Sequence, residues 1–325
     1  MYGGYLLHLP SRRAMLLGKK EETLSYFRIS DDGVSWCDYI DDWGNVVYMA
    51  FNNYTSTRRD IGYDRFALDV FESNGSLYWS EGSVTNYNSP LHLYTFNAQG
   101  EKQRLDNLGL DRDHGVMEFA VSDKYIAYQQ LNTRTLYIDR TTLEEHIVDD
   151  APYLTDGVAL WSDKVYWSDA TDAAVKGLKC GFSVMEYDIL TQTRRTVVDG
   201  TDVPEGSTGE DKQIGDVWEN WLAYTDFGRS EAEETCRIAN GRYYGGEIIL
   251  HHLPTGLEWE ITDNAGDDEI VRMWGRWMVW RHQWYSIYGM DLCKHPELKY
   301  YINQCPDYTG EPTVKTETPR RTHLP

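Results

Sequence analysis

The sequence predicts an all-β protein made of repeated hairpins, and three observations support this prediction. Aromatic residues are abundant, with 24 Tyr and 12 Trp in 325 residues, and large flat side chains suit the half-buried surfaces of strands. A segment of two short apolar strands around a polar turn is found six times along the chain. A second hairpin follows each copy. Together these observations predict a β-propeller of four-stranded antiparallel blades.

The six copies of the first hairpin share one aromatic position. In each copy the second strand carries a Trp or a Tyr at the same place, and neighbouring aromatics are between 39 and 57 residues apart. This spacing is typical of blades with four short strands and variable loops. The six segments are 27–39, 66–82, 119–131, 158–170, 214–227 and 271–283, and their aromatics are Trp36, Trp79, Tyr128, Trp167, Tyr224 and Trp280.

The second hairpins share a different pattern. An alternating strand leads into a polar turn with Gly, Thr or Asn, and the next strand ends in Val, Ile or Leu. We name the four strands of a blade a, b, c and d, from the axis outward, so that these segments form the c–d pairs. The clearest examples are 91–105, 135–148, 183–198 and 247–262.

The blade count depends on the two ends of the chain. Residues 5–17 read as a c–d hairpin with no a–b pair before it. Because an open sheet edge invites aggregation, we expect this hairpin to complete the last blade, whose a–b pair is 271–283. Residues 288–302 also read as c–d, so six blades are predicted with seven as the alternative. We expect one propeller domain over residues 1–305 and an extended or disordered tail over 306–325.

Two short motifs link the repeat to a known family. The end of strand b reads Val-x-Trp-x-Asp-Tyr, in Val34, Trp36, Asp38 and Tyr39. The turn after strand c reads Tyr-Asp-x-x-Thr, in Tyr187, Asp188 and Thr191. With these motifs the repeat resembles that of TolB-type propellers, over most of residues 5–302. The resemblance implies a fold. It implies no particular chemistry, because this family includes binding proteins, scaffolds and some enzymes.

The charge of the chain restricts its partners. The formal net charge is −21, and no stripe of Lys or Arg offsets it, so nucleic acids and anionic membrane surfaces are unfavourable partners. No run of 18 apolar residues predicts a membrane span. The first twenty residues lack the charged-then-apolar order of a signal peptide. We nevertheless expect an extracytoplasmic location, periplasmic or secreted. The sequence does not indicate an oligomeric state.

Five cysteines are present, and none forms a Cys-x-x-Cys pair. Cys180 and Cys236 fall in equivalent long loops just before strand c, so we predict a disulfide between them. A second bond, between Cys293 and Cys305, would bridge the last hairpin to the tail. Cys37, on strand b, is then expected to be a buried free thiol. The alternative is that all five are reduced, as an intracellular location would require.

The predicted binding face carries the b–c and d–a connections. The two longest b–c connections, 168–182 and 225–246, belong to consecutive blades, and long loops in compact domains are often functional. Arg and Tyr are favoured in binding surfaces, and aromatic rings stack on sugars. The alternatives are that the loops are surface decoration and that the two tyrosines begin strand c. The predicted binding residues are Arg237, Arg242, Tyr243, Tyr244, Asp169, Asp226, His114 and His282.

Carboxylates recur on the same face. Two residues after each strand-b aromatic comes a polar residue: Asp38, Glu81, Gln130, Asp169, Asp226 and His282. Such a ring could bind a cation, but we favour a structural role in which the carboxylate accepts backbone N–H bonds in the b–c turn. The acidic d–a connections 106–115, 199–211 and 263–269 suggest calcium, although none has the full calcium-loop pattern.

The sequence favours binding over catalysis. It contains no H-E-x-x-H, G-x-S-x-G or P-loop motif. We therefore predict a non-catalytic recognition or scaffold propeller that binds a protein or a glycan. The alternative is a carbohydrate-active propeller enzyme of the lyase or hydrolase type. It would require His114 and His282 to converge with carboxylates in one metal-binding pocket.

Overall fold

The computed structural model describes the strands between residues 5 and 83, with most side chains from residue 71 onward. It also describes residues 91–107, 115–130, 134–150, 155–178, 181–202, 210–227, 246–264, 267–282 and 286–309. The chain divides into two compact units, Met1–Asp150 and Ala151–Pro325, and each is described by itself.

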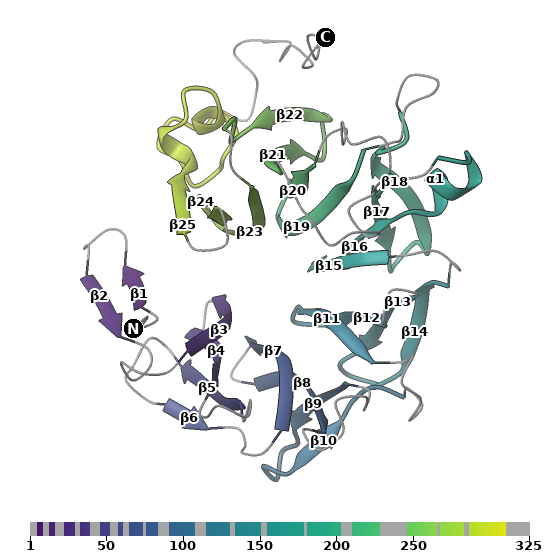
Figure 1. The fold of residues 1–325 in the computed structure, drawn as a ribbon, viewed down its shortest axis with the longest axis vertical. Helices are drawn as coiled ribbons and strands as arrows, with labels where there is room; N and C mark the ends of the chain where they lie inside the picture. Colours follow the sequence, from purple (N-terminus) through teal and green to yellow (C-terminus); the bar gives the residue numbers. More distant parts are fainter. Residues whose placement is uncertain are drawn as a thin grey trace. The chain divides into compact units, whose positions relative to one another are not determined.

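The first unit contains a hairpin, two joined four-stranded ladders and one separate four-stranded sheet (Figure 1). The two ladders are linked by a single residue pair, Val46 with Arg65. The hairpin is β1 (Tyr5–His8) with β2 (Arg13–Leu16). The two joined ladders are β3 (Thr23–Ile29), β4 (Gly33–Tyr39), β5 (Val46–Asn52) and β6 (Arg58–Asp60), then β7 (Arg65–Ser73), β8 (Ser76–Ser83), β9 (His92–Phe96) and β10 (Lys102–Arg104). The separate sheet is β11 (Val116–Val121), β12 (Tyr125–Gln130), β13 (Arg134–Asp139) and β14 (Glu145–Asp149).

The second unit contains two four-stranded sheets and one three-stranded sheet, all antiparallel. The first is β15 (Thr155–Trp161), β16 (Lys164–Asp169), β17 (Ser183–Asp188) and β18 (Thr193–Val198). The second is β19 (Lys212–Trp218), β20 (Trp221–Asp226), β21 (Glu247–His252) and β22 (Leu257–Glu260). The third is β23 (Asp268–Trp274), β24 (Trp277–His282) and β25 (Ser286–Asp291).

The helices of the described residues are short. They are α1 (Thr171–Val175) and the 3-10 turns Leu292–Lys294 and Leu298–Tyr300. None of the helices in the described segments has the length and apolar character that crossing a membrane requires. The predicted all-β class is therefore confirmed. The number of blades stays a prediction. The expectation that the hairpin 5–17 supplies strand c of the last blade is wrong, because β25 pairs with β24 in that place, and β1 and β2 form a two-stranded sheet of their own.

The predicted a–b hairpins are all present, and their aromatics are structurally equivalent. Each of the six aromatics is the fourth residue of its strand b, in β4, β8, β12, β16, β20 and β24. Successive residues of a strand point to opposite faces, so a shared position means a shared face. The five whose side chains are described are at most 9% exposed: Trp79, Tyr128, Trp167, Tyr224 and Trp280.

The core of each unit lies between the faces of successive sheets. In the first unit, Tyr78 and Leu93 pack with Phe119 and Tyr128 of the next sheet. In the second unit, Tyr166 and Val184 of one sheet pack with Ile214 and Tyr224 of the next. Face-to-face packing of this kind buries both sides of each sheet, and it explains why apolar residues occupy both alternating positions in the b strands.

Three tryptophans in the second unit form a ladder across its sheets. Trp161, Trp218 and Trp274 each end strand a, just before the a–b turn. The ring centroids of Trp161 and Trp218 are 4.8 Å apart, and those of Trp218 and Trp274 are 6.3 Å apart. The same end of strand a in consecutive sheets is therefore lined with indole.

The end of the chain differs from its predicted form. Residues 288–302 also read as a c–d hairpin, and the c strand of that pattern is present as β25. The d strand is wrong, because residues 292–300 form two 3-10 turns instead. Pro296 has no backbone N–H for a ladder, and Leu292 and Leu298 are fully buried in the core between β19–β22 and β23–β25.

A disulfide holds this C-terminal segment. Cys293 and Cys305 are bonded, with their Cα atoms 5.2 Å apart, so the predicted bond between the last hairpin and the tail is confirmed. Cys180 and Cys236 lie outside the described residues, as does the side chain of Cys37. We name residues 292–309 the C-terminal cap, because they cover the apolar edge of the last two sheets.

Candidate functional site

The predicted binding residues that the structure describes end their b strands. Asp169, Asp226 and His282 are the last residues of β16, β20 and β24. Each lies directly opposite the first residue of strand a in its own sheet. The structure therefore brings each of them to the end of its sheet that carries the b–c and d–a connections. The other predicted residues, Arg237, Arg242, Tyr243, Tyr244 and His114, lie outside the described residues.

Asp169 anchors the connection that follows it. Its carboxylate accepts a hydrogen bond of 2.6 Å from the backbone N–H of Thr171, at the start of α1. The other carboxylate oxygen is paired with Arg194 of the outer strand β18. The side chain is only 1% exposed. Asp169 therefore has the contact expected of a structural carboxylate at a b–c turn.

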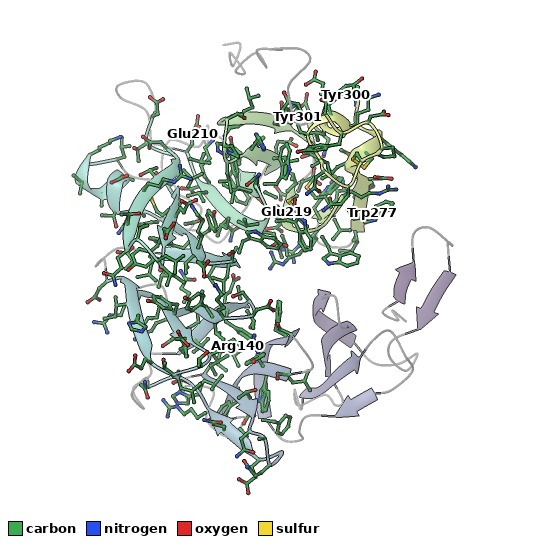
Figure 2. All side chains as sticks on the ribbon, turned by 180° about the vertical axis from the view of Figure 1, so that it is seen from behind. Arg140, Glu210, Glu219, Trp277, Tyr300 and Tyr301 are labelled. Carbon is green, nitrogen blue, oxygen red and sulfur yellow. A yellow bond between two sulfur atoms is a disulfide. The ribbon has the colours of Figure 1, made fainter. Side chains whose placement is uncertain are left out.

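Asp226 belongs to a buried charge cluster. Lys212, at the first position of strand a, donates to Asp226 and lies 2.8 Å from a carboxylate oxygen of Glu210. Burial alone would lower the pKa of Lys212, but the two carboxylates outweigh burial and raise it. Lys212 is therefore a fixed cation, and it cannot serve as a base near neutral pH. Glu210 is labelled in Figure 2.

His282 is held by an acid of its own sheet. Its Nδ1 lies 2.8 Å from Oδ1 of Asp268, and the indole N–H of Trp280 donates to the same oxygen at 3.0 Å. Asn264 donates to the second oxygen of Asp268 at 2.5 Å. Asp268 is fully buried, so this network fixes the imidazole at the end of β24.

The acidic d–a connections are partly described, and two of their acids, Asp106 and Asp199, are engaged in hydrogen bonds. Asp106 accepts bonds from the backbone N–H of Leu93 at 2.6 Å and from Arg104 at 2.8 Å. Burial would raise its pKa, but hydrogen bonds from His92 and Arg104 lower it overall. Asp199 accepts the backbone N–H of Thr201 at 2.7 Å. Within the described residues, no three His, Cys, Asp or Glu side chains are grouped as metal ligands would be.

A pocket lies at the opposite end of the β19–β22 sheet. Its volume is about 290 Å³, and it is formed by the a–b turn, the c–d turn and the C-terminal cap. Figure 2 labels Glu219 and Tyr301, which contribute to its wall. We name it the cap pocket. Its lining residues are Glu219, Asn220, Trp221, His252, Pro254, Thr255, Tyr301, Asn303 and Tyr308.

Aromatic rings form the floor of the cap pocket. The ring of Trp221 lies 4.6 Å from that of His252 and 6.2 Å from that of Tyr301, between centroids. Trp259 completes the cluster, 5.1 Å from Tyr301, and its indole N–H donates to Glu297 at 2.8 Å. Trp221 and Tyr301 are almost fully buried, whereas Tyr308 is 49% exposed.

Polar groups form the rim of the cap pocket. Asn303 donates to Oε2 of Glu219 at 2.7 Å, and His252 Nδ1 lies 2.8 Å from the hydroxyl oxygen of Thr255. Burial and the neighbouring His251 lower the pKa of His252, so its ring is neutral near pH 7. The described residues that line the pocket include no Lys or Arg. The carboxylate of Glu219 gives this lining a formal charge of about −1.

Sequence reasoning did not find the cap pocket. The residues that line the pocket come from positions 219–221, 252–255 and 301–308. The sequence predicts a tail from residue 306, so the last group falls partly in that tail. The available signal was that aromatic residues lie close together in the sequence at two places, Trp218 with Trp221 and Tyr300 with Tyr301. Aromatic residues beside a turn can equally belong to the core, and most of these do.

No protein-family model matches the chain, and no curated protein sequence matches it. Solved structures do match. An oligogalacturonate lyase in complex with manganese has a TM-score of 0.56 at 10% identity, over 88% of this chain and 82% of that chain. The β-propeller domain of the Trilobed protease from Pyrococcus furiosus has a TM-score of 0.55 at 9% identity, over 83% of each chain.

A putative TolB from Agrobacterium tumefaciens is also among the similar structures. Its TM-score is 0.49 at 9% identity, over 79% of this chain and 87% of that chain. At such identities a likeness between structures concerns the fold and leaves the activity open. The chain therefore has the β-propeller fold, which it shares with the lyase and with the protease domain.

Proposed function

We propose that this propeller is a non-catalytic recognition or scaffold module that binds a protein or a glycan through the face of its b–c and d–a connections. One observation carries the proposal. The described polar residues at that end of the b strands, Asp169, Asp226 and His282, are each paired within their own sheet. Paired groups of this kind fix the ends of the connections, and a rigid rim supports loops that contact a ligand.

The charge of the chain favours one class of partner. With a net charge of −21, the surrounding field attracts basic partners, tolerates neutral polar ones and repels polyanions. Arg237, Arg242, Tyr243 and Tyr244 are the proposed contact residues, because guanidinium and phenol groups give directional bonds and large contact areas. A neutral glycan or a basic protein segment fits this combination.

A loop deletion tests the proposal. A glycan array and a panel of basic and acidic peptides would first identify a ligand for the unmodified chain. Deleting residues 229–242 should then abolish binding and shift the melting temperature by only a few degrees, because surface loops add little to core stability. A second variant replaces Arg237, Arg242, Tyr243 and Tyr244 by Ala without shortening the loop, and it should lose binding as well. Unfolding on deletion would make the loop structural, and unchanged binding would place the site elsewhere.

A carbohydrate-active enzyme is the second candidate, because an oligogalacturonate lyase bound to manganese shares the fold. Incubation with polygalacturonate, with and without Mn²⁺, should release no unsaturated ends if the recognition proposal holds. Turnover that disappears in His114→Ala and His282→Ala but persists in Leu190→Ala, at a 68% exposed position, would replace that proposal. Calcium is tested separately, since an ion that binds only the folded state raises the melting temperature.

A further inference from the structure

We infer that the cap pocket binds one ring of a neutral sugar. The pocket lies at the a–b and c–d end of the β19–β22 sheet, whereas the proposed recognition face lies at the other end of the strands. The inference therefore goes beyond the proposed function, and either can fail without the other.

The size of the pocket and the exposed tyrosine at its rim suit a single sugar ring. A volume of about 290 Å³ is at the lower limit for small-molecule sites. Trp221, His252 and Tyr301 pack on one another at the floor and are therefore fixed before any ligand arrives. Tyr308 keeps 49% of its surface exposed at the rim. The C–H groups of a pyranose carry partial positive charge and pack favourably on the negative face of an exposed ring such as that of Tyr308.

The rim supplies the hydrogen bonds that sugar hydroxyls need. Asn220 and Asn303 carry amides, Thr255 a hydroxyl and Glu219 a carboxylate, so the rim can both donate and accept. Two of these groups are held in place, Glu219 by Asn303 at 2.7 Å and Thr255 by His252 at 2.8 Å. Preorganised polar groups bind with a smaller loss of conformational freedom.

The charges of the lining decide the class of ligand. No described lining residue is a Lys or an Arg, so nothing there would pair with an acidic sugar. A quaternary ammonium would need several open aromatic faces, but Trp221 and Tyr301 are only 3% and 8% exposed. A neutral sugar is therefore favoured over both.

Saturation-transfer NMR on the full chain tests the inference. The probes are the methyl pyranosides of glucose, galactose and mannose, with sodium galacturonate and choline for comparison. We expect at least one neutral glycoside to bind with a dissociation constant of about 1 mM, as for ligands of this size. Tyr308→Ala should weaken that binding at least tenfold. Tyr288→Ala is the matched control, because Tyr288 is 51% exposed and belongs to β25.

Three results would overturn the inference. The first is no binding by any neutral glycoside at about 20 mM, well above the dissociation constant expected for this size. The second is binding of choline or galacturonate in preference to the glycosides. The third is equal glycoside binding by the unmodified chain and by Tyr308→Ala, provided that both melt at the same temperature. Asn303→Ala gives an independent check, because it removes a rim amide without removing a ring.

Discussion

Trp167 illustrates how one side chain per blade fills the space beside a sheet. It is the fourth residue of β16, is fully buried, and lies between Val158 of strand a and Met185 of strand c. Arg194 of strand d stacks over its ring, 5.2 Å from the centroid. An indole in this position contacts every strand of its sheet, so its loss leaves a cavity that no single neighbour can fill.

Trp167→Ala should therefore lower the free energy of unfolding by about 3–5 kcal/mol. The reason is the lost transfer free energy of the indole together with the remaining cavity. Urea unfolding followed by circular dichroism measures the change. Val175→Ala is the control, because Val175 is 76% exposed and its loss should cost about 0.5 kcal/mol or less. Equal costs for the two variants would contradict the role of the shared strand-b position.

Glu186 is a residue whose ionisation is linked to folding. It accepts Lys164 at 2.7 Å and Arg195 at 2.9 Å, and its side chain is 5% exposed. Burial would raise its pKa, but the hydrogen bonds from Arg195, Lys164 and Tyr166 lower it from 4.5 to about 2. A lowered carboxyl pKa stabilises the folded state above the unfolded value and ceases to do so as the pH falls through the folded value.

The stability of the unmodified chain should accordingly decline between pH 4.5 and about 2, in part because of Glu186. Glu186→Gln should be less stable by about 1–2 kcal/mol at pH 7 and should decline less steeply over that window. Urea unfolding at several pH values measures both quantities. Glu144→Gln, at an exposed turn position, is the control. Parallel pH profiles for the unmodified chain and Glu186→Gln would refute the linkage.

At the scale of elements, the last sheet replaces a strand with a cross-linked cap. The other described sheets of the second unit have four strands, whereas β23–β25 has three and is followed by the C-terminal cap. Hairpin periodicity predicted every a–b pair correctly, because alternation of apolar residues has a direct geometric cause. It failed at residues 292–300, because buried Leu292 and Leu298 look the same in a strand and in a 3-10 turn.

Cys293→Ser with Cys305→Ser should lower the free energy of unfolding by about 3 kcal/mol. The bond spans 12 residues, and closing a loop of that order removes entropy from the unfolded chain. Thermal unfolding with and without a reducing agent measures the effect. The reducing agent should destabilise the unmodified chain and should have a smaller effect on the double variant. An equal effect on both would assign the redox sensitivity to other cysteines.

At the scale of the whole molecule, net charge opposes compactness. The chain carries 52 acidic and 31 basic residues, so the folded state is under self-repulsion at low ionic strength. Pairs such as Lys212 with Asp226 offset this locally, but they leave a large excess of negative charge. The acidic surface was evident from composition alone. The pairing was not, because it depends on register.

Raising the salt concentration from about 10 to 150 mM should raise the melting temperature by several degrees. The Debye length falls from about 30 to 8 Å over this range, which screens long-range repulsion more than the short internal pairs. Differential scanning calorimetry in sodium chloride measures the change, and choline chloride controls for specific cation binding. A melting temperature that falls with salt would mean that the ion pairs outweigh the repulsion.

We also predict that residues 1–305 unfold as one domain. Calorimetry should then show a single transition whose calorimetric and van't Hoff enthalpies agree. Removing residues 310–325 should leave that transition in place. Two separate transitions would instead show that Met1–Asp150 and Ala151–Pro325 are independent domains.

The cap pocket marks the limit of prediction from the sequence. Trp221 and Tyr301 are separated by 80 residues, and neither flanking pattern indicates that they meet. Repetition predicts what each blade has in common, because the same interface is built several times. A site made where the repeat is broken has no second copy to reveal it, so its residues were read as turn and tail.

The tryptophan ladder gives this molecule an optical signature. Indoles whose centres lie 4.8 and 6.3 Å apart share their electronic excitation, and a tilted arrangement such as the 46° between Trp161 and Trp218 makes that coupling chiral. The far-ultraviolet circular dichroism of the chain should therefore contain a paired positive and negative band from the strong indole transition, in addition to the signal of the strands. Each of the three indoles belongs to a different sheet. The band pair therefore reports whether neighbouring sheets are packed against each other, and no added fluorophore is needed.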